Sequence, residues 1–412
     1  MSGNGRTIYI AGAGIAGMTL ALALAKFGAT VVVIERQPQV QEVGAGLQVS
    51  PNARRILNRL GLDKALSEHA FEPAGIDIYP YGAKRPLTTL ELGPAMRERF
   101  GAPYTVMHRA DLAQVLYRAC KRFANIDLLF GVRSYDVVSH ARGVSVTVDE
   151  SDGKSRSARA FAFIGADGVH SRTRTDVLMG KEAQYSGTVA WRIALGKSAL
   201  SGMLASDRTS MLWGPGYHAV TYPLPQRRQT NVVLVARLKE DEAFGARPPK
   251  RPALPWSMFP DPRFKALLEA GGDDWGFWPI NTVETDKLNE GSVGLVGDAA
   301  HAMVPFQAQG AAMAIEDAAI LAPLLMTEPD AASALGRYAS LRKPRLDQVR
   351  KVSRSNALAF HLEWPFTIAR DSVVRSQGPQ GHLKRLAWLY GYDPAPDPDL
   401  PAAPQRSTQG QT

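Results

Sequence analysis

Near the start of the chain, a short β-rich run is followed by three glycines in the spacing Gly-x-Gly-x-x-Gly and then by an apolar helical stretch. The glycines are Gly12, Gly14 and Gly17, and a second β-rich run ends in Glu35. Such glycines permit a tight turn, a close approach of the backbone to a pyrophosphate, and close packing of helix on strand. Glu35 stands where a carboxylate accepts the hydroxyl groups of an adenosine ribose, which argues against a 2′-phosphate. The pattern therefore predicts a parallel α/β unit that binds FAD or NAD.

A second segment with similar chemistry lies far along the chain, at residues 294–318. A short apolar run ends in a Gly-Asp pair at Asp298, and small residues then lead to Gly310 and an alanine-rich helix closed by Glu316 and Asp317. An aspartate at the carboxyl end of a strand can accept hydrogen bonds from a sugar hydroxyl, and the free N–H groups of a helix start favour a partly negative group. The segment is thus interpreted as a ligand site. Taken alone, it is equally compatible with glycines that only permit tight packing.

Length and charge narrow the class of protein. A chain of 412 residues is long enough for two or three domains, and 45% hydrophobic with 21% charged residues is typical of a globular protein. The formal net charge of +9 is spread along the sequence and does not form basic runs. This distribution favours a modest preference for anions and argues against nucleic acid as a partner.

The sequence also indicates the compartment. A single cysteine, Cys120, excludes an internal disulfide, fits a reducing compartment and is expected in the core. The start of the chain has no secretory signal, and the apolar region at residues 8–34 is broken by glycines and Lys26, so we expect a cytoplasmic protein without a membrane partner. No group of His, Cys, Asp and Glu has metal-ligand spacing, and no metal is expected.

Four motifs occur in order along the chain. They are Gly-Ala-Gly-Ile-Ala-Gly at 12–17, His-Arg-Ala-Asp-Leu at 108–112, Gly-Ala-Asp-Gly-Val-His-Ser at 165–171 and Gly-Asp-Ala-Ala-His at 297–301. This ordered set resembles the single-component FAD-dependent aromatic hydroxylases, in the branch of salicylate hydroxylase, 3-hydroxybenzoate 6-hydroxylase and 6-hydroxynicotinate 3-monooxygenase. The resemblance covers nearly the whole chain.

The resemblance implies an α/β fold: a Rossmann-like FAD-binding domain of the glutathione-reductase type, an inserted mixed or antiparallel β-sheet for the substrate, and C-terminal helices. The expected FAD-binding domain is discontinuous, at 1–73, 103–180 and 283–330, with the substrate domain at 74–102 and 181–282. Helices are expected over 331–392, at Ala331 to Leu341, Pro344 to Phe360 and Leu383 to Tyr390. Residues 393–412 are rich in Pro, Gln and Asp and are expected to form a mobile tail.

The resemblance also implies cofactor contacts, residue by residue. Arg109 is expected near the flavin, and Asp167 belongs to a motif tied to both FAD and the nicotinamide cofactor. A glycine-rich loop at residues 42–52 leads into a helix with Asn52 as its expected cap. Ala308 stands where many relatives have glycine, which fits if its φ is negative. The full implied set is Gly12, Gly14, Ala16, Gly17, Glu35, Arg36, Gly46, Gln48, Arg109, Asp167, Asp298, Pro305, Gly310 and Ala311.

The implied reaction is hydroxylation of a small aromatic acid, phenolic or hydroxypyridine, with O2. NADH or NADPH would visit transiently as the reductant, since the sequence has no second glycine fingerprint, and the oxygen would be carried as a flavin C4a-hydroperoxide. The working unit would be a monomer or a homodimer. Leu47 and Gln48 occupy the loop where hydroxynicotinate enzymes carry a histidine, which ranks that substrate lower.

Between residues 185 and 281 the pattern changes to short alternating segments, which predict an antiparallel sheet. The four expected strands are Thr188 to Leu195, Thr209 to Trp213, His218 to Pro223 and Asn231 to Arg237. His218 and Tyr222 are four residues apart on one predicted strand, so both side chains lie on one face. A histidine there could deprotonate a phenol, with Tyr222 orienting the same hydroxyl group, as the resemblance also implies. The alternative is that His218 is a packed strand residue. Arg192 is a candidate for binding a carboxylate or for a structural ion pair, and Phe306 is a candidate substrate contact.

Two histidines beside the motifs, His108 and His301, are interpreted as structural. Two other functions remain compatible with the sequence. One is an FAD oxidase or dehydrogenase that shares the ADP-binding half, and the other is a flavin-binding redox sensor without turnover.

Overall fold

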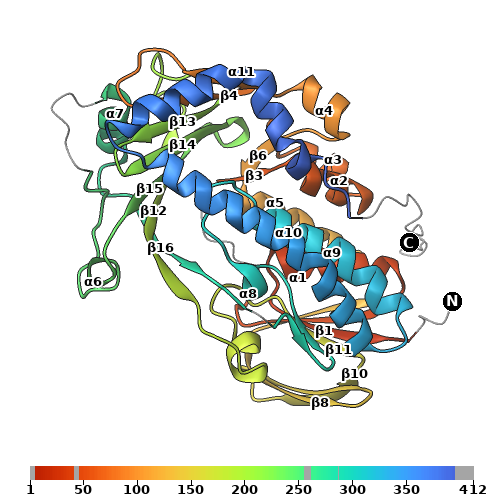
Figure 1. Ribbon diagram of the computed structural model, residues 1–412. Coiled ribbons are helices and arrows are strands. Elements are labelled where there is room, and N and C mark those ends of the chain that lie inside the picture. Colours follow the sequence, from red (N-terminus) through yellow and green to blue (C-terminus); the bar gives the residue numbers. More distant parts are fainter. Residues whose placement is uncertain (1–4, 41–45, 255–260, 286, 395–412) are drawn as a thin grey trace, which may run out of the picture.

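Two large β-sheets and two small ones, joined by helices, make up the described part of the molecule (Figure 1). The computed structural model describes residues 5–40, 46–254, 261–285 and 287–394. Part of the predicted loop at 42–52, and residues 395–412 of the predicted tail, lie outside these residues. The predicted limits of the domains remain a prediction.

The first sheet contains the predicted glycine unit. Strand β1 leads through the glycines into helix α1 (Ile15–Lys26), and β2 follows with Glu35 at its end, as predicted. The neighbouring strands are parallel except for the edge pair β17 and β18. Runs of Val and Ile suit strands that are covered on both faces. In order across the sheet, the strands are β17 (Asn289–Glu290), β18 (Val293–Leu295), β11 (Ala162–Gly165), β1 (Thr7–Ala11), β2 (Thr30–Glu35) and β7 (Ile126–Phe130).

Helix α9 (Gly310–Thr327) packs against α1 in the middle of the molecule. It does not end at Glu316 and Asp317, as the sequence suggested, but continues for ten more residues. The two acids are fully buried and paired with arginines, so they stabilise the middle of the helix instead of ending it in solvent. The helix is long and apolar enough to cross a membrane, but 72% of it is buried inside the protein, as expected for a core helix.

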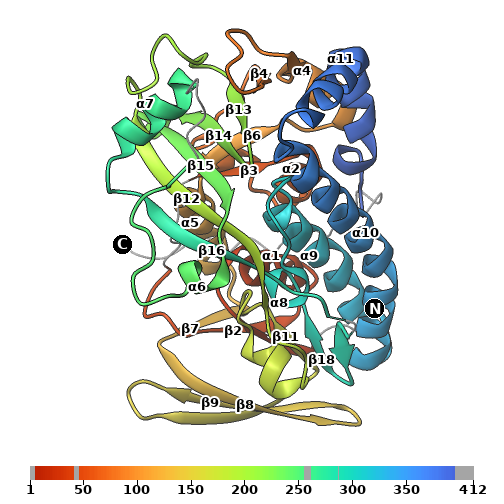
Figure 2. The same ribbon diagram turned by 60° about the vertical axis from the view of Figure 1, so that its left-hand side comes forward.

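Between β7 and β11 the chain forms a small antiparallel sheet of its own (Figure 2). Its strands are β8 (Val132–His140), β9 (Gly143–Glu150) and β10 (Ser155–Ala160). Tyr135 of β8 packs on Phe163 of β11, with ring centroids 5.4 Å apart. The small sheet thereby covers one end of the parallel sheet.

The second large sheet is the predicted substrate sheet. All four strands expected from the alternating pattern are present, and only the pair of β13 and β4 is parallel. Helix α7 (Pro262–Gly271) packs on one face through Phe264 and Leu267, among residues such as Trp191 and Tyr217. In order across the sheet, the strands are β16 (Gly276–Thr282), β12 (Gln184–Gly196), β15 (Gln229–Arg237), β14 (Tyr217–Leu224), β13 (Thr209–Gly214), β4 (Gly75–Tyr79) and β5 (Thr88–Glu91).

Short elements connect the two large sheets. Strands β3 and β6 pair antiparallel, and β6 runs directly into helix α5, whose N-cap is His108. The His108 ring accepts a hydrogen bond from the N–H of Ala110, in agreement with a structural role. The remaining short elements, including α6 and α8 elsewhere in the chain, are β3 (Gly46–Val49), α2 (Pro51–Arg59), α3 (Asp63–Ser67), α4 (Pro94–Phe100), β6 (Thr105–His108), α5 (Arg109–Lys121), α6 (Glu240–Ala243) and α8 (Asp298–His301).

The C-terminal helices differ from the prediction. A single helix, α10 (Ala331–Phe360), contains Pro344, where the sequence suggested a break. Arg342 and Arg345 on either side of the proline bind the acids of α9, and these ion pairs hold the helix together across the lost hydrogen bond. Helix α11 (Phe366–Tyr390) begins well before the predicted residue 383 and is kinked at Gly378, which has φ 58°. Figure 2 shows α9, α10 and α11 along one side of the molecule.

Candidate functional site

The glycine turn opens onto a cavity of about 440 Å³. The cavity lies between the ends of β1, β2 and β11, where an open parallel sheet binds its ligand. Its charged lining is mostly basic and includes Arg133 and Arg172, which suits a ligand with phosphates. Six of the predicted cofactor residues line it: Gly12, Gly14, Glu35, Arg36, Arg109 and Asp167.

Two glycines of the turn cannot carry a side chain. A Cβ atom built on Gly12, which has φ 105°, would lie 2.4 Å from the carbonyl oxygen of Ala166. A Cβ atom on Gly17 would lie 1.9 Å from the carbonyl oxygen of Gly12. Gly14 is the N-cap of α1 and has extended φ and ψ angles with no side-chain cap, so the first N–H groups of the helix remain for an anion.

Glu35 braces this turn from the neighbouring strand. One oxygen of its carboxylate accepts a hydrogen bond of 2.9 Å from the N–H of Ala13, and the other accepts one of the same length from Gln37. Each carboxylate oxygen has a second lone pair, so the group can also accept from ribose hydroxyls. Glu35 therefore both stabilises the turn and lines the cavity.

The carboxylate of Asp167 is occupied by protein donors. It accepts hydrogen bonds from the Tyr135 hydroxyl, from the Ser171 hydroxyl, and from both the N–H and the hydroxyl of Thr173. Burial and the Asp167 carboxylate both raise the pKa of Tyr135, which keeps it a donor. The side chain of Asp167 therefore fixes the turn at residues 166–173, and this turn forms one wall of the cavity.

The second predicted segment approaches the first. Gly297, at φ 61°, is the N-cap of α8, and a Cβ atom there would meet Ala16 of α1 at 2.8 Å and Ala314 of α9 at 3.3 Å. Asp298 is exposed, and a Cβ atom on Gly310 would lie 3.9 Å from its Oδ1. A carboxylate and the N-terminus of a long helix thus stand side by side, as the ligand-site interpretation requires.

The loop before α9 carries Pro305, Phe306 and Ala308. The N–H of Ala308 bonds the carbonyl of Pro305 to close a turn. Ala308 has φ 52°, so the expected negative φ is wrong and the alanine occupies a left-handed conformation that favours glycine. Helix α10 holds the loop, because Ser353 and Asn356 donate to the carbonyls of Val304 and Phe306.

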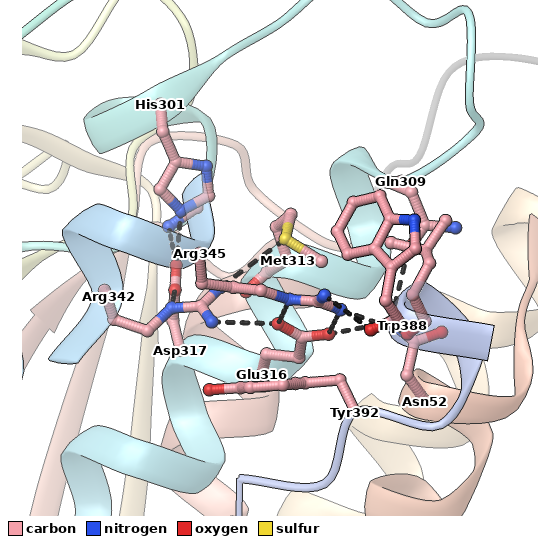
Figure 3. Close-up of polar contacts among 12 residues, drawn as sticks. Asn52, His301, Gln309, Met313, Glu316, Asp317, Arg342, Arg345, Trp388 and Tyr392 are labelled. Carbon is pink, nitrogen blue, oxygen red and sulfur yellow. Dashed lines mark hydrogen bonds and ion pairs between the residues drawn. The ribbon is translucent and has the colours of Figure 1, made fainter. Parts of the chain in front are cut away.

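A buried polar network lies behind the start of α9 (Figure 3). The amide of Asn52 donates to Glu316 at 2.7 Å and to Gln309 at 3.2 Å, while Ser50 precedes the helix at the N-cap position expected for Asn52. Glu316 also binds Arg345, which in turn donates to the carbonyls of Trp388 and Leu389. The network ties residues just after β3 to α9, to the middle of α10 and to the end of α11.

The neighbouring acid organises the turn at Asp298. Asp317 accepts hydrogen bonds from Arg342, at 2.7 Å, and from the N–H of Gly297, at 2.8 Å, and His301 lies 2.6 Å away. Burial raises the pKa of Asp317, but the interactions with His301 and Arg342 outweigh it and lower this pKa to about 2. The structural role expected for His301 agrees with this contact.

We call the side of the substrate sheet that contacts Phe306 its inner face. Cross-strand pairing places Ala190, His218 and Val235 side by side on this face, and Phe306 packs on them. Side chains alternate along each strand, so every second residue from these positions lies on the same face. The inner face therefore also includes Arg192, Trp213, Tyr222 and Asn231.

Three donors on the inner face are buried without a hydrogen-bond partner among the described residues. They are Nε1 of Trp213, Nε of Arg192 and Nδ2 of Asn231, and the loop adds the unpaired Oε1 of Gln307. A buried donor without a partner is costly, and such groups gather where a ligand completes them. Asn231 was not predicted from the sequence, because an asparagine in a strand carries no distinctive motif.

His218 and Tyr222 share the inner face but have different neighbours. His218 lies 5.1 Å from the ring of Phe306 and its Nδ1 is 2.9 Å from Nε2 of His361. Tyr222 lies opposite Asn231 and packs under Gly46, where a Cβ atom would meet its ring at 2.5 Å. Four strand residues span about 13 Å between Cα atoms.

Two further predicted cofactor residues, Gln48 and Ala311, lie on β3 and α9. Gln48 on β3 accepts a hydrogen bond from Tyr104, and Ala311 lies in the first turn of α9. Among the described residues, no three His, Cys, Asp or Glu side chains are placed to hold a metal ion.

Comparison with known proteins decides the family. The model of a family described as the FAD binding domain matches residues 6–353. The 3-amino-4-hydroxybenzoate 2-monooxygenase of Streptomyces platensis is 33% identical over 408 residues, which cover 96% of this chain and 98% of that protein. This chain belongs to the FAD-dependent aromatic monooxygenases. The predicted family and the FAD cofactor are thereby confirmed, and the cavity beside the glycine turn fits the ADP half of FAD.

Other relatives of this monooxygenase agree. The 3-hydroxybenzoate 6-hydroxylase of Klebsiella oxytoca is 30% identical over 386 residues, covering 93% of this chain and 96% of that protein. Among solved structures, a single-residue variant of HpxO of Klebsiella pneumoniae complexed with FAD has a TM-score of 0.77 at 22% identity, covering 93% of this chain and 98% of that chain. A salicylate hydroxylase substrate complex has a TM-score of 0.73 at 22% identity, covering 99% and 100% of the two chains. The structural likeness confirms the predicted fold.

Proposed function

We propose that this monooxygenase hydroxylates a small aromatic acid with a ring hydroxyl group on the inner face of the substrate sheet. One observation carries the proposal. Unpaired buried donors, Nε of Arg192 and Nδ2 of Asn231, stand at one end of this face, and His218 stands at the other beside Phe306 of the FAD-binding loop. Such a face suits a carboxylate at the first end and a hydroxyl group at the second.

In this proposal, Arg192 and Asn231 bind the carboxylate and Tyr222 lies beside them. We therefore revise the idea that Tyr222 orients the same hydroxyl group as His218, because the two rings have different neighbours and their Cα atoms are about 13 Å apart along the strand. Burial raises the pKa of Tyr222, although Arg192 opposes it, so the phenol stays a neutral donor to the acid.

At the other end, His218 accepts the proton of the substrate hydroxyl. Burial, with a smaller effect of His361, lowers the pKa of His218 well below its usual value, which keeps the ring neutral and able to accept. Loss of the phenolic proton raises electron density at the ortho and para carbons, which are the positions to be hydroxylated. FAD, when bound, supplies the activation of O2 with electrons from NADH or NADPH.

The FAD site in this proposal consists of residues already placed. The turn at Gly12–Gly17 and Glu35 hold the adenosine and pyrophosphate, Arg109 lies on the flavin side, and Asp298 with the start of α9 holds the part of the cofactor next to the ring. Phe306 separates that part from His218 and keeps water from the reacting atoms. We further propose that the enzyme works in the cytoplasm, as a monomer or a homodimer.

Aerobic consumption of NADH and NADPH tests the function. The purified FAD-loaded enzyme is mixed with salicylate, 3-hydroxybenzoate, 3-amino-4-hydroxybenzoate or 6-hydroxynicotinate, and hydroxylated product and H2O2 are both measured. We expect at least one of the benzoates to speed consumption and to yield product, and 6-hydroxynicotinate to be the poorest. Consumption that is unaffected by every acid and yields only H2O2 would indicate an oxidase or a redox sensor instead.

A further inference from the structure

The contact between His218 and His361 lies at the hydroxyl end of the inner face. His218 belongs to β14, and His361 follows the last residue of α10, 143 residues later. Nδ1 of His218 and Nε2 of His361 are 2.9 Å apart, and the two residues are 3% and 4% exposed. Because two lone pairs or two N–H groups repel, a single hydrogen lies between these nitrogens.

Packing holds both rings in place. Phe360 meets the His218 ring at 5.4 Å and stacks on Trp213 at 5.6 Å. The guanidinium carbon of Arg370, from α11, lies over the ring of Trp213, 4.2 Å from its centroid. The end of α10 therefore packs against the inner face, where His361 contacts His218. No sequence motif marks His361 as part of this contact.

The position of one hydrogen decides what His218 can do. A neutral imidazole with its hydrogen on Nδ1 has a lone pair on Nε2 and can accept a phenolic proton there. The other tautomer carries N–H at Nε2 and cannot. His361 makes the one hydrogen bond of the His218 ring that occurs among the described residues, so it is the group in position to select the tautomer.

We propose that His361 is a positioning residue that accepts a hydrogen bond from Nδ1–H of His218 and so leaves the lone pair of Nε2 for the substrate hydroxyl. The O–H bond of the substrate then breaks as an N–H bond forms at Nε2, leaving a phenolate and an imidazolium whose Nδ1–H still points at His361. This inference rests on the proposed function, in which His218 contacts that hydroxyl.

Selective ¹⁵N labelling of histidine in the FAD-loaded enzyme tests the proposal, because ring ¹⁵N shifts report which nitrogen carries hydrogen. The His218 signals are assigned by their absence from His218→Asn. In His361→Gln, an amide oxygen near the position of the lost Nε2 can still accept a hydrogen bond from Nδ1–H of His218. The phenyl ring in His361→Phe cannot accept it. His382→Gln is the matched control, since His382 is a half-buried histidine on α11 that contacts the carbonyl of Val374.

We expect His218 to carry its hydrogen on Nδ1 in the parent, in His361→Gln and in His382→Gln, and to show a mixture in His361→Phe. Product formed per NADH consumed should fall about 10-fold or more in His361→Phe alone, with FAD retention and the rate of flavin reduction unchanged. Hydrogen on Nε2 in the parent would overturn the proposal, as would a parent-like tautomer and coupling in His361→Phe.

The experiment remains decisive if a variant does not fold or if the parent enzyme hydroxylates none of the acids. If His361→Phe does not fold, the parent spectrum still assigns the tautomer, and His361→Gln should then keep both the tautomer and the coupling. A parent enzyme that hydroxylates none of the aromatic acids would contradict the proposed function, whereas the dependence of the His218 tautomer on His361 would still be decided by the spectra.

Discussion

The backbone N–H of Gly46 donates a hydrogen bond of 2.7 Å to Oδ1 of Asn231. This bond joins β3 to β15 and fixes the direction of the Asn231 amide, so that its Nδ2 stays buried and unpaired on the inner face. Gly46 can make this close contact because it has no Cβ atom, which would otherwise lie 2.9 Å from Cγ of Asn231. The orientation of the amide that we propose binds the substrate carboxylate is thus set by the β3–β6 pair.

Replacing Asn231 by Leu should weaken binding of the aromatic acid. The variant loses one donor to the carboxylate, and a hydrogen bond to a charged group contributes about 1.5–3 kcal/mol, so KM should rise about 10-fold or more. The matched control is Thr230→Val, one residue earlier on the strand and on the opposite face. Steady-state kinetics with the best acid measure the change. An unaltered KM in Asn231→Leu would place the carboxylate elsewhere.

Asp298→Ala should weaken retention of FAD. The exposed carboxylate next to the start of α9 is available to the cofactor, and it makes no side-chain hydrogen bond to another described residue that its loss would disturb. Gel filtration followed by the flavin absorbance of the protein peak gives the retained fraction. Asp273→Ala, an exposed carboxylate in the loop before β16, serves as the control and should hold FAD like the parent.

Gly17→Ala should prevent a stable FAD-binding turn, because its Cβ atom would lie 1.9 Å from the carbonyl oxygen of Gly12. The contrast is Gly336→Ala in α10, where a Cβ atom meets nothing within 4 Å. Alanine is better than glycine in a helix by about 1 kcal/mol, so Gly336→Ala should raise the free energy of unfolding slightly. Thermal unfolding of both variants checks the pair. Similar melting temperatures for the two would contradict the close packing at Gly17.

Glu316→Gln should be strongly destabilising. The change leaves Arg342 and Arg345 without one of their buried negative partners, and breaking a buried ion pair costs about 3–5 kcal/mol. Glu328→Gln, which removes an exposed pair with Arg337 near the end of the same helix, should cost at most about 1 kcal/mol. Urea unfolding at neutral pH measures both. Equal midpoints would mean that the network in Figure 3 contributes little to stability.

Acid should destabilise the protein partly through His361. Burial first, and then the charge of Arg237, lower its pKa from about 6.5 to about 4. Below pH 6.5, His361 therefore binds a proton in the unfolded chain but stays neutral in the folded chain. The free energy of unfolding consequently falls as pH drops from 6.5 to 4. The loss approaches about 3 kcal/mol, at 1.36 kcal/mol per pKa unit. The buried His218 acts in the same direction.

Urea midpoints at pH 7 and pH 4.5 measure this effect. The difference between them should be smaller in His361→Phe than in the parent, since one titrating group is gone, and His382→Gln should behave like the parent. A pH dependence that is the same in His361→Phe would show that His361 does not titrate as inferred.

Sequence reasoning succeeded where the chemistry is local. The glycine turn and Glu35 lie within 24 residues, and each residue there has one physical reason for its type. The alternating strands around His218 were likewise visible, because period-two patterns are a property of the strand itself. The family motifs then supplied the cofactor.

It failed where partners are distant in the chain. Glu316 looked like the end of a helix because its arginines are 26 and 29 residues away and Asn52 is 264 residues away. Pro344 looked like a break for the same reason. His361 and Asn231 gave no signal at all, since their importance comes from the residues that the fold brings beside them.

The order of strands in the parallel sheet has a consequence for synthesis of the chain. Strand β11 at 162–165 pairs with β1 on one side and with β18 at 293–295 on the other. A ribosome must therefore make the whole substrate sheet before β11 gains its second neighbour. Until then the nascent chain presents an open, apolar strand edge, which is a site for aggregation and for chaperone binding. We expect a fragment ending at residue 282 to be insoluble. The parallel sheet is therefore completed only after the substrate sheet has been synthesised.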